Sequence, residues 1–301
     1  MTTDLTKRFR RLTAVDGLDL AVERGEVFGF LGPNGAGKST TLRMMVGLVK
    51  PTRGHVELFG RDVWKDHCGA LGRVGAMIES PAFYKYLSGM ENIRLLANTG
   101  GNHSAAEIEE ALEIVGLADR ARDKVKSYSQ GMRQRLGIAL AIVGRPELVL
   151  LDEPTNGLDP QGMKEVRDLI KRLSADLSLT VFLSSHLLNE VEQVCTRIAV
   201  VNKGRVIESG KVSDLLAGSN RYRVRLESPS RACETMRELG WGKVVDTSED
   251  SILVDVDGGG PAELNRFLVE RGFAVSALLP ERTSLEDLYL KLMDGDNAAA
   301  D

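Results

Sequence analysis

The sequence predicts an α/β fold in two parts: a helix-covered parallel sheet over residues 1–217 and a smaller α/β domain over residues 218–301. The first observation is a glycine-rich loop that stands between an apolar segment and a helical one. The second is a set of short segments that are apolar throughout, as expected of strands buried on both faces. These are residues 26–31, 148–151, 180–184 and 197–202. The third is a change in composition near Gly218-Ser219-Asn220, which we interpret as a linker.

Composition narrows the class of protein. The chain of 301 residues is 43% hydrophobic and 27% charged, so it can bury a full core. Its net charge of -4 lacks the basic excess of a nucleic-acid-binding protein, and no nucleic acid is expected as a partner. The three cysteines are scattered without a CxxC pair, which fits a reducing compartment. The polar N-terminus does not resemble a signal peptide. The longest apolar stretch, residues 136–143, is shorter than the ~18 residues that span a bilayer.

The glycine-rich loop follows the first apolar segment and precedes a helical pattern over residues 40–48. Glycines let the backbone curl so that several N–H groups point at one anion, and the helix N-terminus faces the same place. Lys38 is placed to reach the β- and γ-phosphates of a nucleotide, and the Ser39 hydroxyl to bind Mg²⁺. Every required position is present, which disfavours an ordinary turn. The loop comprises Gly32, Pro33, Asn34, Gly35, Ala36, Gly37, Lys38, Ser39 and Thr40.

The stretch between the loop and residue 148 is rich in helical patterns, and we expect a helical subdomain over about residues 80–140. Apolar residues recur at helical spacing over residues 105–115 and 134–143. Ser104 and Glu107 have the spacing of a capping box, which predicts a helix start at this point.

A second glycine-containing turn, Ser129-Gln130-Gly131-Met132, precedes the later of these helices. Its backbone N–H groups and the Ser129 hydroxyl can bind an anion. The same residues would serve equally well as a helix N-cap, and taken alone that interpretation is favoured.

Two adjacent carboxylates end the apolar segment 148–151. At the carboxyl end of a central strand, Asp152 can hold Mg²⁺ through water, and Glu153 can act as general base on the attacking water. An acidic turn after a strand is common by itself. Its combination with the phosphate loop favours the catalytic interpretation.

The sequence pattern of residues 218–301 predicts strands and helices in the order β-α-β-β-α-β, which indicates a small ferredoxin-like domain. A final helix is expected over residues 284–293, with Leu285, Leu288, Tyr289 and Leu292 on one face. The expected elements before it are residues 222–227, 231–239, 243–246, 251–256, 261–271 and 273–278.

Four motifs in a fixed order resemble the ATP-binding subunit of an ABC transporter over about residues 4–215: the phosphate loop, the turn at Ser129, the segment 150–160 and Ser184-Ser185-His186. The implied fold is a P-loop NTPase core of the ABC type with an inserted helical subdomain. The resemblance implies ATP and Mg²⁺ as cofactors. It implies a second copy of the chain and a membrane permease subunit as partners, with the chain peripheral on the cytoplasmic face of the membrane.

The resemblance also implies roles for single residues. Gly32 to Thr40 would be the Walker A loop, Asp152 would end Walker B, and Glu153 would be the catalytic glutamate. The other roles fall to residues outside these two motifs. Ser129 and Gly131 would contact ATP held by the second copy, Asp159 would lie at the dimer interface, His186 would contact the γ-phosphate, and Phe9 would stack on adenine or pack in the core.

This sequence departs from the family pattern in three places. Tyr128, Gln130 and Met132 replace usual signature residues, although Ser129 and Gly131 are kept. Glu79 stands where the family usually has glutamine. The first strand also looks short, with little apolar sequence before Leu5.

The glutamate at position 79, followed by Ser-Pro-Ala-Phe-Tyr, is similar to ATPase subunits of bacterial antibiotic and lantibiotic efflux systems. We hypothesise that Glu79 senses Mg²⁺ and the γ-phosphate. The following aromatics, Phe83, Tyr84 and Tyr86, would either dock the membrane subunit or pack within the helical subdomain.

The favoured function is an ATP-hydrolysing subunit that drives export of a drug, antibiotic or peptide-like or lipid-like substrate. The alternative is a soluble ATPase of the same type that acts on DNA or the ribosome. Relatives that act on DNA carry a long coiled coil that splits the cassette, and this sequence has none. Relatives that act on the ribosome usually carry two cassettes per chain, and this sequence has one, so the alternative is disfavoured. A regulatory protein without catalysis is disfavoured by Glu153 and His186.

Overall fold

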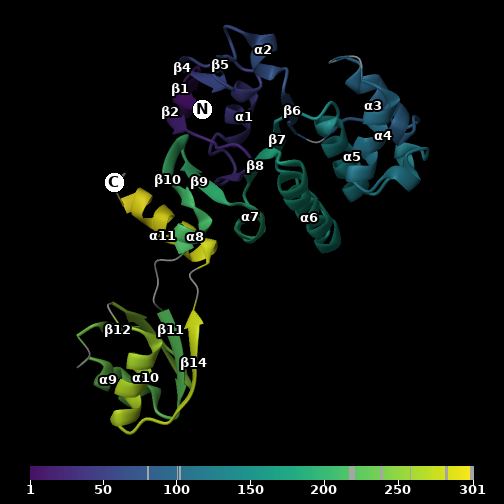
Figure 1. The fold of residues 1–301 in the computed structure, drawn as a ribbon. Helices are drawn as coiled ribbons and strands as arrows, with labels where there is room; N and C mark the ends of the chain where they lie inside the picture. Colours follow the sequence, from purple (N-terminus) through teal and green to yellow (C-terminus); the bar gives the residue numbers. More distant parts are fainter. Residues whose placement is uncertain are drawn as a thin grey trace. The chain divides into compact units, whose positions relative to one another are not determined.

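A computed structural model describes residues 1–79, 81–99, 101, 103–216, 221–237, 240–257, 259–281 and 284–298. The chain forms two compact units, Met1–Lys211 together with residues 296–298, and Val212–Gly295, each with its own core (Figure 1). The division after Lys211 lies a few residues before the boundary at 217/218 expected from sequence. The linker expected at residues 218–220 lies outside the described residues.

The first unit begins with an antiparallel sheet in the order β2-β1-β4-β5. The expectation of a short first strand is wrong, because β1 is eight residues long and starts at Thr2. Its buried threonines substitute for apolar residues: the Thr2 hydroxyl donates to the Leu18 carbonyl at 2.9 Å. The strands of this sheet are β1 Thr2–Phe9, β2 Leu12–Leu20, β4 Arg53–Leu58 and β5 Arg61–Asp62.

The second sheet of this unit has the order β10-β9-β3-β8-β7-β6. Its strands are parallel from β9 to β6, and β10 pairs antiparallel with β9. All four apolar segments that predict strands lie in it. Because the central strands are parallel, the residues that follow β3, β7 and β8 come together at one edge. The strands are β3 Val27–Leu31, β6 Val74–Met77, β7 Leu148–Asp152, β8 Thr180–Ser185, β9 Arg197–Asn202 and β10 Arg205–Lys211.

Helices α3, α4 and α5 pack against one another and form the predicted helical subdomain beyond β6 (Figure 1). Capping boxes at Ser88 and Ser104 start the first two. Helix α5 begins one turn earlier than the apolar spacing predicts, because Ser129 caps it. The helices of the unit are α1 Lys38–Met45, α2 His67–Leu71, α3 Gly89–Ala97, α4 Ala105–Ile114, α5 Gln130–Ile142, α6 Pro160–Leu177 and α7 Leu188–Val194, with 3₁₀ turns at Ala118–Arg120 and Val125–Ser127.

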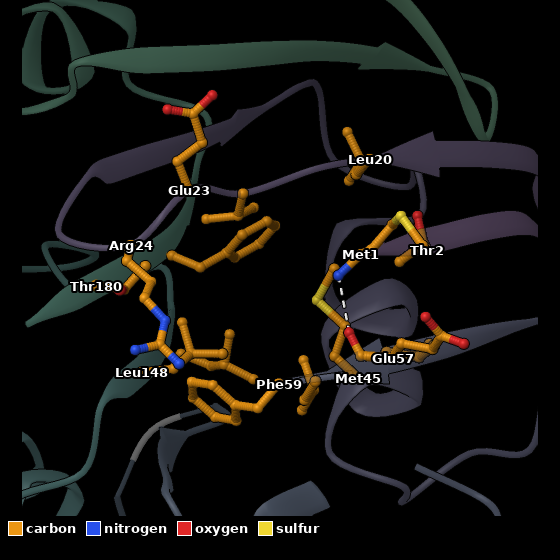
Figure 2. Close-up of a pocket in the computed structure, with 15 residues that line it drawn as sticks. Met1, Thr2, Leu20, Glu23, Arg24, Met45, Glu57, Phe59, Leu148 and Thr180 are labelled. Carbon is orange, nitrogen blue, oxygen red and sulfur yellow. Dashed lines mark hydrogen bonds between the residues drawn. The ribbon is translucent and has the colours of Figure 1, made fainter. Parts of the chain in front are cut away.

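An apolar cavity of about 180 Å³ lies beside the amino-terminal ends of β7 and β8 (Figure 2). It is lined by Leu148 and Thr180, the first residues of β7 and β8, and by Leu20 and Met45. The N-terminal amine of Met1 donates to the Glu57 carbonyl at 2.8 Å beside it. The cavity is therefore separate from the edge that carries the sequence motifs.

The second unit contains a four-stranded antiparallel sheet in the order β12-β13-β11-β14. Its strands and helices follow the β-α-β-β-α-β order that the sequence predicts. The core is formed by residues such as Val224, Val254 and Leu264. The elements are α8 Val212–Leu216, β11 Arg221–Leu226, α9 Pro229–Met236, β12 Gly242–Thr247, β13 Ser251–Val256, α10 Pro261–Glu270, β14 Val275–Glu281 and α11 Leu285–Ala298. Among the described residues, no helix combines the length and apolar character needed to cross a membrane.

Candidate functional site

The phosphate loop connects β3 to α1 in a conformation that needs glycine. Gly35 and Gly37 have φ of 84° and 101°, and Gly37 forms the left-handed N-cap of α1. A Cβ on Gly37 would lie 2.3 Å from the Ala14 carbonyl oxygen, and one on Gly32 would lie 2.3 Å from that of Val201. The loop thus packs tightly on β2 and β9, while Asn34 and Gly35 are exposed at its tip. Its backbone can approach an anion closely.

Lys38 is buried at the start of α1 and its ammonium group turns back over the loop. The Nζ donates to the Gly32 carbonyl at 2.7 Å and to the Pro33 carbonyl at 3.3 Å. It also lies 3.2 Å from Oε1 of Glu153. A buried ammonium needs such partners, and here they hold its charge beside the curled backbone.

Asp152 is the last residue of the buried strand β7, and Glu153 follows it at the same edge. The Ser184 hydroxyl, from the end of β8, donates to Oδ1 of Asp152 at 2.5 Å and accepts from the Glu153 N–H at 3.0 Å. Glu153 has a φ of 48°, a left-handed conformation that residues other than glycine rarely adopt. Ser184 therefore fixes both the side chain of Asp152 and the turn that aims Glu153.

Glu153 is held by two cationic or ionisable partners, one at each carboxylate oxygen. Oε1 faces Lys38, and Oε2 is 2.7 Å from Nδ1 of His186. His186 follows β8 directly, so neighbouring parallel strands bring the acid and the imidazole together. The arrangement can orient a carboxylate as a base while leaving part of the imidazole exposed to a ligand.

Glu79, which follows β6, reaches the same edge. It lines one cavity together with Gln134, Asp152, Glu153 and Asn156. Its backbone φ is 67°, and its side chain forms an ion pair with Arg43 on α1. Three carboxylates thus border this cavity, and oxygen donors of this kind suit Mg²⁺.

Ser129, Gly131 and Asp159 form a second cluster. The Ser129 hydroxyl accepts from the Met132 N–H at 3.2 Å, so the capping role is present in this structure. The Asp159 carboxylate caps α6 by accepting from the Gly162 N–H at 2.9 Å. A Cβ on Gly131 would lie 3.8 Å from the Cα of Gly162, which places the starts of α5 and α6 side by side. Among the described residues, this cluster has no hydrogen bond to the phosphate loop.

Three of the four aromatic residues singled out from sequence, Phe9, Tyr84 and Tyr86, are exposed, and Phe83 is half-buried. The Phe9 side chain, at the end of β1, is 46% exposed, so it does not pack in the core. The Nζ of Lys7 lies 5.0 Å from the centre of its ring. Tyr84 and Tyr86 are also exposed, with ring centres 6.0 Å apart. Their exposure weakens the alternative that they stabilise the helical subdomain by burial.

Two residues of the site were missed by the sequence reasoning. Ser184 belongs to one of the four motifs but has no predicted role of its own, and no pattern in the sequence singles out Arg43. The signal for Ser184 was a hydroxyl at the end of an apolar strand, directly before the histidine. No local pattern indicates Arg43, because its partner Glu79 is 36 residues away in sequence.

Comparisons with known proteins agree with these motifs. The family model described as ABC transporter matches residues 15–156. The bacitracin transport ATP-binding protein BcrA of Bacillus licheniformis is 40% identical over 296 residues, which cover 98% of this chain and 97% of the relative. The daunorubicin/doxorubicin resistance ATP-binding protein DrrA of Streptomyces peucetius is 38% identical over 307 residues, which cover 97% and 91%.

Two solved structures share the fold over about 70% of this chain. The dimeric post-hydrolysis state of the ATP-binding cassette MJ0796, bound to ADP and Pi, superposes with a TM-score of 0.63 at 26% identity. It covers 70% of this chain and 97% of that one. The cbiO1 protein of Clostridium perfringens, part of the transporter complex cbiONQ, gives a TM-score of 0.66 at 25% identity and covers 72% and 90%.

Proposed function

This chain belongs to the ABC transporter family as an ATP-binding and ATP-hydrolysing subunit, and from that premise we propose that it powers export of an antibiotic or similar drug. The near full-length similarity to proteins named for bacitracin transport and for daunorubicin resistance supports this substrate class. The observation that supports Glu153 as the general base in ATP hydrolysis is its contact with both Lys38 and His186.

The proposed nucleotide site uses the loop Gly32 to Thr40 for the phosphates and the exposed ring of Phe9 for adenine. Mg²⁺ bound at Ser39, Asp152 and Glu79 would neutralise phosphate charge. These donors fit the ion because all are hard oxygens, and Asp152 and Glu79 line one cavity. Ser184 keeps the Asp152 carboxylate oriented toward that cavity.

The contacts of Lys38 suggest how ATP would prepare the base. Lys38 contacts Oε1 of Glu153, and His186 contacts Oε2. Phosphate oxygens would draw the ammonium away from Oε1 of Glu153, because they carry more negative charge than one carboxylate. Oε1 would then be free to accept the proton of the attacking water, while His186 keeps the carboxylate in place and faces the γ-phosphate.

A second copy of the chain would complete the site. Ser129, Gly131 and Asp159 lie in a cluster separate from Lys38, and a head-to-tail dimer would bring this cluster onto the ATP of the other copy. The dimeric cassette with ADP and Pi is a precedent in a related fold. Closure by ATP and reopening after hydrolysis would be a population shift driven by differential binding.

The closing and reopening of the dimer would drive a conformational change in a separate membrane-spanning chain, with this subunit at the cytoplasmic face. We propose the exposed Tyr84 and Tyr86, together with Phe83, as the docking surface. They follow Glu79 closely in sequence, so a movement at the nucleotide would reach them through a short segment.

The test uses Glu153→Gln, which should bind ATP without hydrolysing it, because loss of a general base costs about 10²- to 10⁴-fold in rate. The variant is purified with Mg-ATP from a detergent-solubilised native host, with Lys38→Met as a control that cannot hold the phosphates. A stoichiometric polytopic membrane protein that co-purifies with Glu153→Gln supports the proposal. Because docking is assigned to Tyr84 and Tyr86 and not to the nucleotide, Lys38→Met should retain this protein and lose only the closed dimer. Ribosomal or DNA-repair proteins as the partners would overturn it.

A growth assay tests the substrate class. Expression with the identified membrane subunit should raise the inhibitory concentration of bacitracin or of daunorubicin, and Glu153→Gln should abolish the increase. Equal sensitivity to both compounds in the two strains would refute the assignment to these drugs.

A further inference from the structure

The three carboxylates of the nucleotide cavity are each held by a different partner. Asp152 accepts from the Ser184 hydroxyl, and Glu153 contacts Lys38 and His186. Glu79 has the Arg43 guanidinium as its partner. A carboxylate at this position adds a negative charge beside the phosphates of ATP, and Arg43 balances that charge when no metal is bound.

Arg43 stands on the same helix as the proposed Mg²⁺ ligand Ser39. The two are four residues apart on α1, so they lie on one face of the helix, separated by about 6 Å along its axis. The partner of Glu79 therefore stands one helical turn from Ser39 on α1. Glu79 also lines the cavity of Asp152, so it faces both possible partners.

The ion pair is suited to exchange because it is accessible to water. The side chains of Arg43 and Glu79 are 38% and 62% exposed. Ion pairs of this kind are weak, since solvent screens them and the side chains lose rotamer freedom. A divalent cation held by the phosphates can compete with such a partner for the carboxylate.

We propose that Arg43 is a positioning residue that holds Glu79 in the nucleotide-free state and yields it to Mg²⁺ when Mg-ATP binds. Arg43 and the metal then compete for one carboxylate, and each turnover exchanges the partner of Glu79. The inference rests on the proposed role of Glu79 as a metal ligand. It adds a link between α1 and the segment that precedes Tyr84.

The experiment is a double-mutant cycle on Mg²⁺-dependent nucleotide binding. The full-length wild type, Arg43→Met, Glu79→Gln and the double variant are titrated with Mg²⁺ in the presence of a fluorescent ATP analogue, and the half-saturating Mg²⁺ concentration is measured. Arg43→Met should lower this concentration roughly two- to fivefold. Arg43 competes with Mg²⁺ for the Glu79 carboxylate, and an exposed ion pair contributes about that factor to the equilibrium constant. Glu79→Gln should raise it, and adding Arg43→Met to Glu79→Gln should have no further effect.

Two further variants separate the exchange from general charge effects. Arg61→Met removes the same charge from an exposed pair with Asp66 and should leave the Mg²⁺ dependence unchanged. Arg43→Lys keeps the cation and should restore the wild-type value. Melting curves confirm that each variant is folded.

The outcomes distinguish two failures. If Glu79→Gln leaves the Mg²⁺ dependence unchanged, Glu79 is no metal ligand, and that part of the proposed function falls together with the inference. If Glu79→Gln weakens Mg²⁺ binding but Arg43→Met has the same effect in both backgrounds, or none in either, only the exchange is overturned.

Discussion

Removal of the Ser184 hydroxyl is the sharpest test of how the site is held together. Ser184 is fully buried, and its oxygen donates to Oδ1 of Asp152 at 2.5 Å and accepts from the Glu153 N–H at 3.0 Å. Ser184→Ala removes one hydrogen bond to a charged group, worth about 1.5–3 kcal/mol, and one neutral bond, worth about 0.5–1.5 kcal/mol. The free energy of unfolding should fall by about 2–4.5 kcal/mol.

Urea denaturation of the nucleotide-free protein measures this loss. The matched control is Ser185→Ala, because Ser185 is also buried and its hydroxyl accepts from the Leu187 N–H, a neutral donor, at 2.9 Å. The control should cost about 1 kcal/mol. The reasoning is refuted if Ser184→Ala is no more destabilising than Ser185→Ala.

The same substitution should affect catalysis. Asp152 would lose the partner that orients it, and loss of such a partner lowers metal affinity or activity about 10- to 100-fold. The rate of ATP hydrolysis against Mg²⁺ concentration measures the effect. A rate and Mg²⁺ dependence equal to those of the wild type would show that Asp152 keeps its orientation without Ser184.

Two further predictions concern the loop and the helical subdomain. Gly35→Ala should lower the free energy of unfolding by about 1–2 kcal/mol, because alanine is strained at a φ of 84° although its Cβ would meet no other atom. Gly37→Ala should cost a further ~1–3 kcal/mol, because its Cβ would also meet the Ala14 carbonyl oxygen at 2.3 Å. Equal losses in urea denaturation would contradict the tight packing of the loop on β2. The Ser104 N–H and hydroxyl lower the pKa of Glu107 in the folded state, so this stabilisation is complete above the ordinary pKa of glutamate and is lost as pH falls through the folded-state value. Stability followed by circular dichroism should therefore decrease less on acidification in Glu107→Gln than in the wild type, and identical pH profiles would contradict this.

The candidate site shows where sequence reasoning succeeds and where it stops. The loop could be recognised because its glycines, Lys38 and Ser39 are contiguous, and chemistry of this kind requires a fixed local spacing. Asp152 was singled out because it ends an apolar segment, and the role of His186 came from the resemblance of the four motifs to the family. The contact between Arg43 and Glu79 could not be predicted, because it joins residues from different elements and leaves no periodic signal.

The first strand illustrates a different limit. The sequence before Leu5 is polar, and the expected strand was short. The structure extends it to Thr2, because buried threonine hydroxyls can satisfy backbone carbonyls between two neighbouring strands. Whether a polar segment can be buried depends on its partners, which only the fold supplies.

The sequence by itself determined the α/β class, the phosphate loop, the acidic pair and the order of elements in the C-terminal unit, because glycine conformation, capping and apolar periodicity act over a few residues. Tertiary structure alone decided which partners hold each charged group: Lys38 and His186 on Glu153, Ser184 on Asp152, and Arg43 on Glu79. Those contacts depend on the order of the strands in the sheet, because that order places the ends of β3, β6, β7 and β8 at one edge. Strand order arises from packing between segments far apart in the chain.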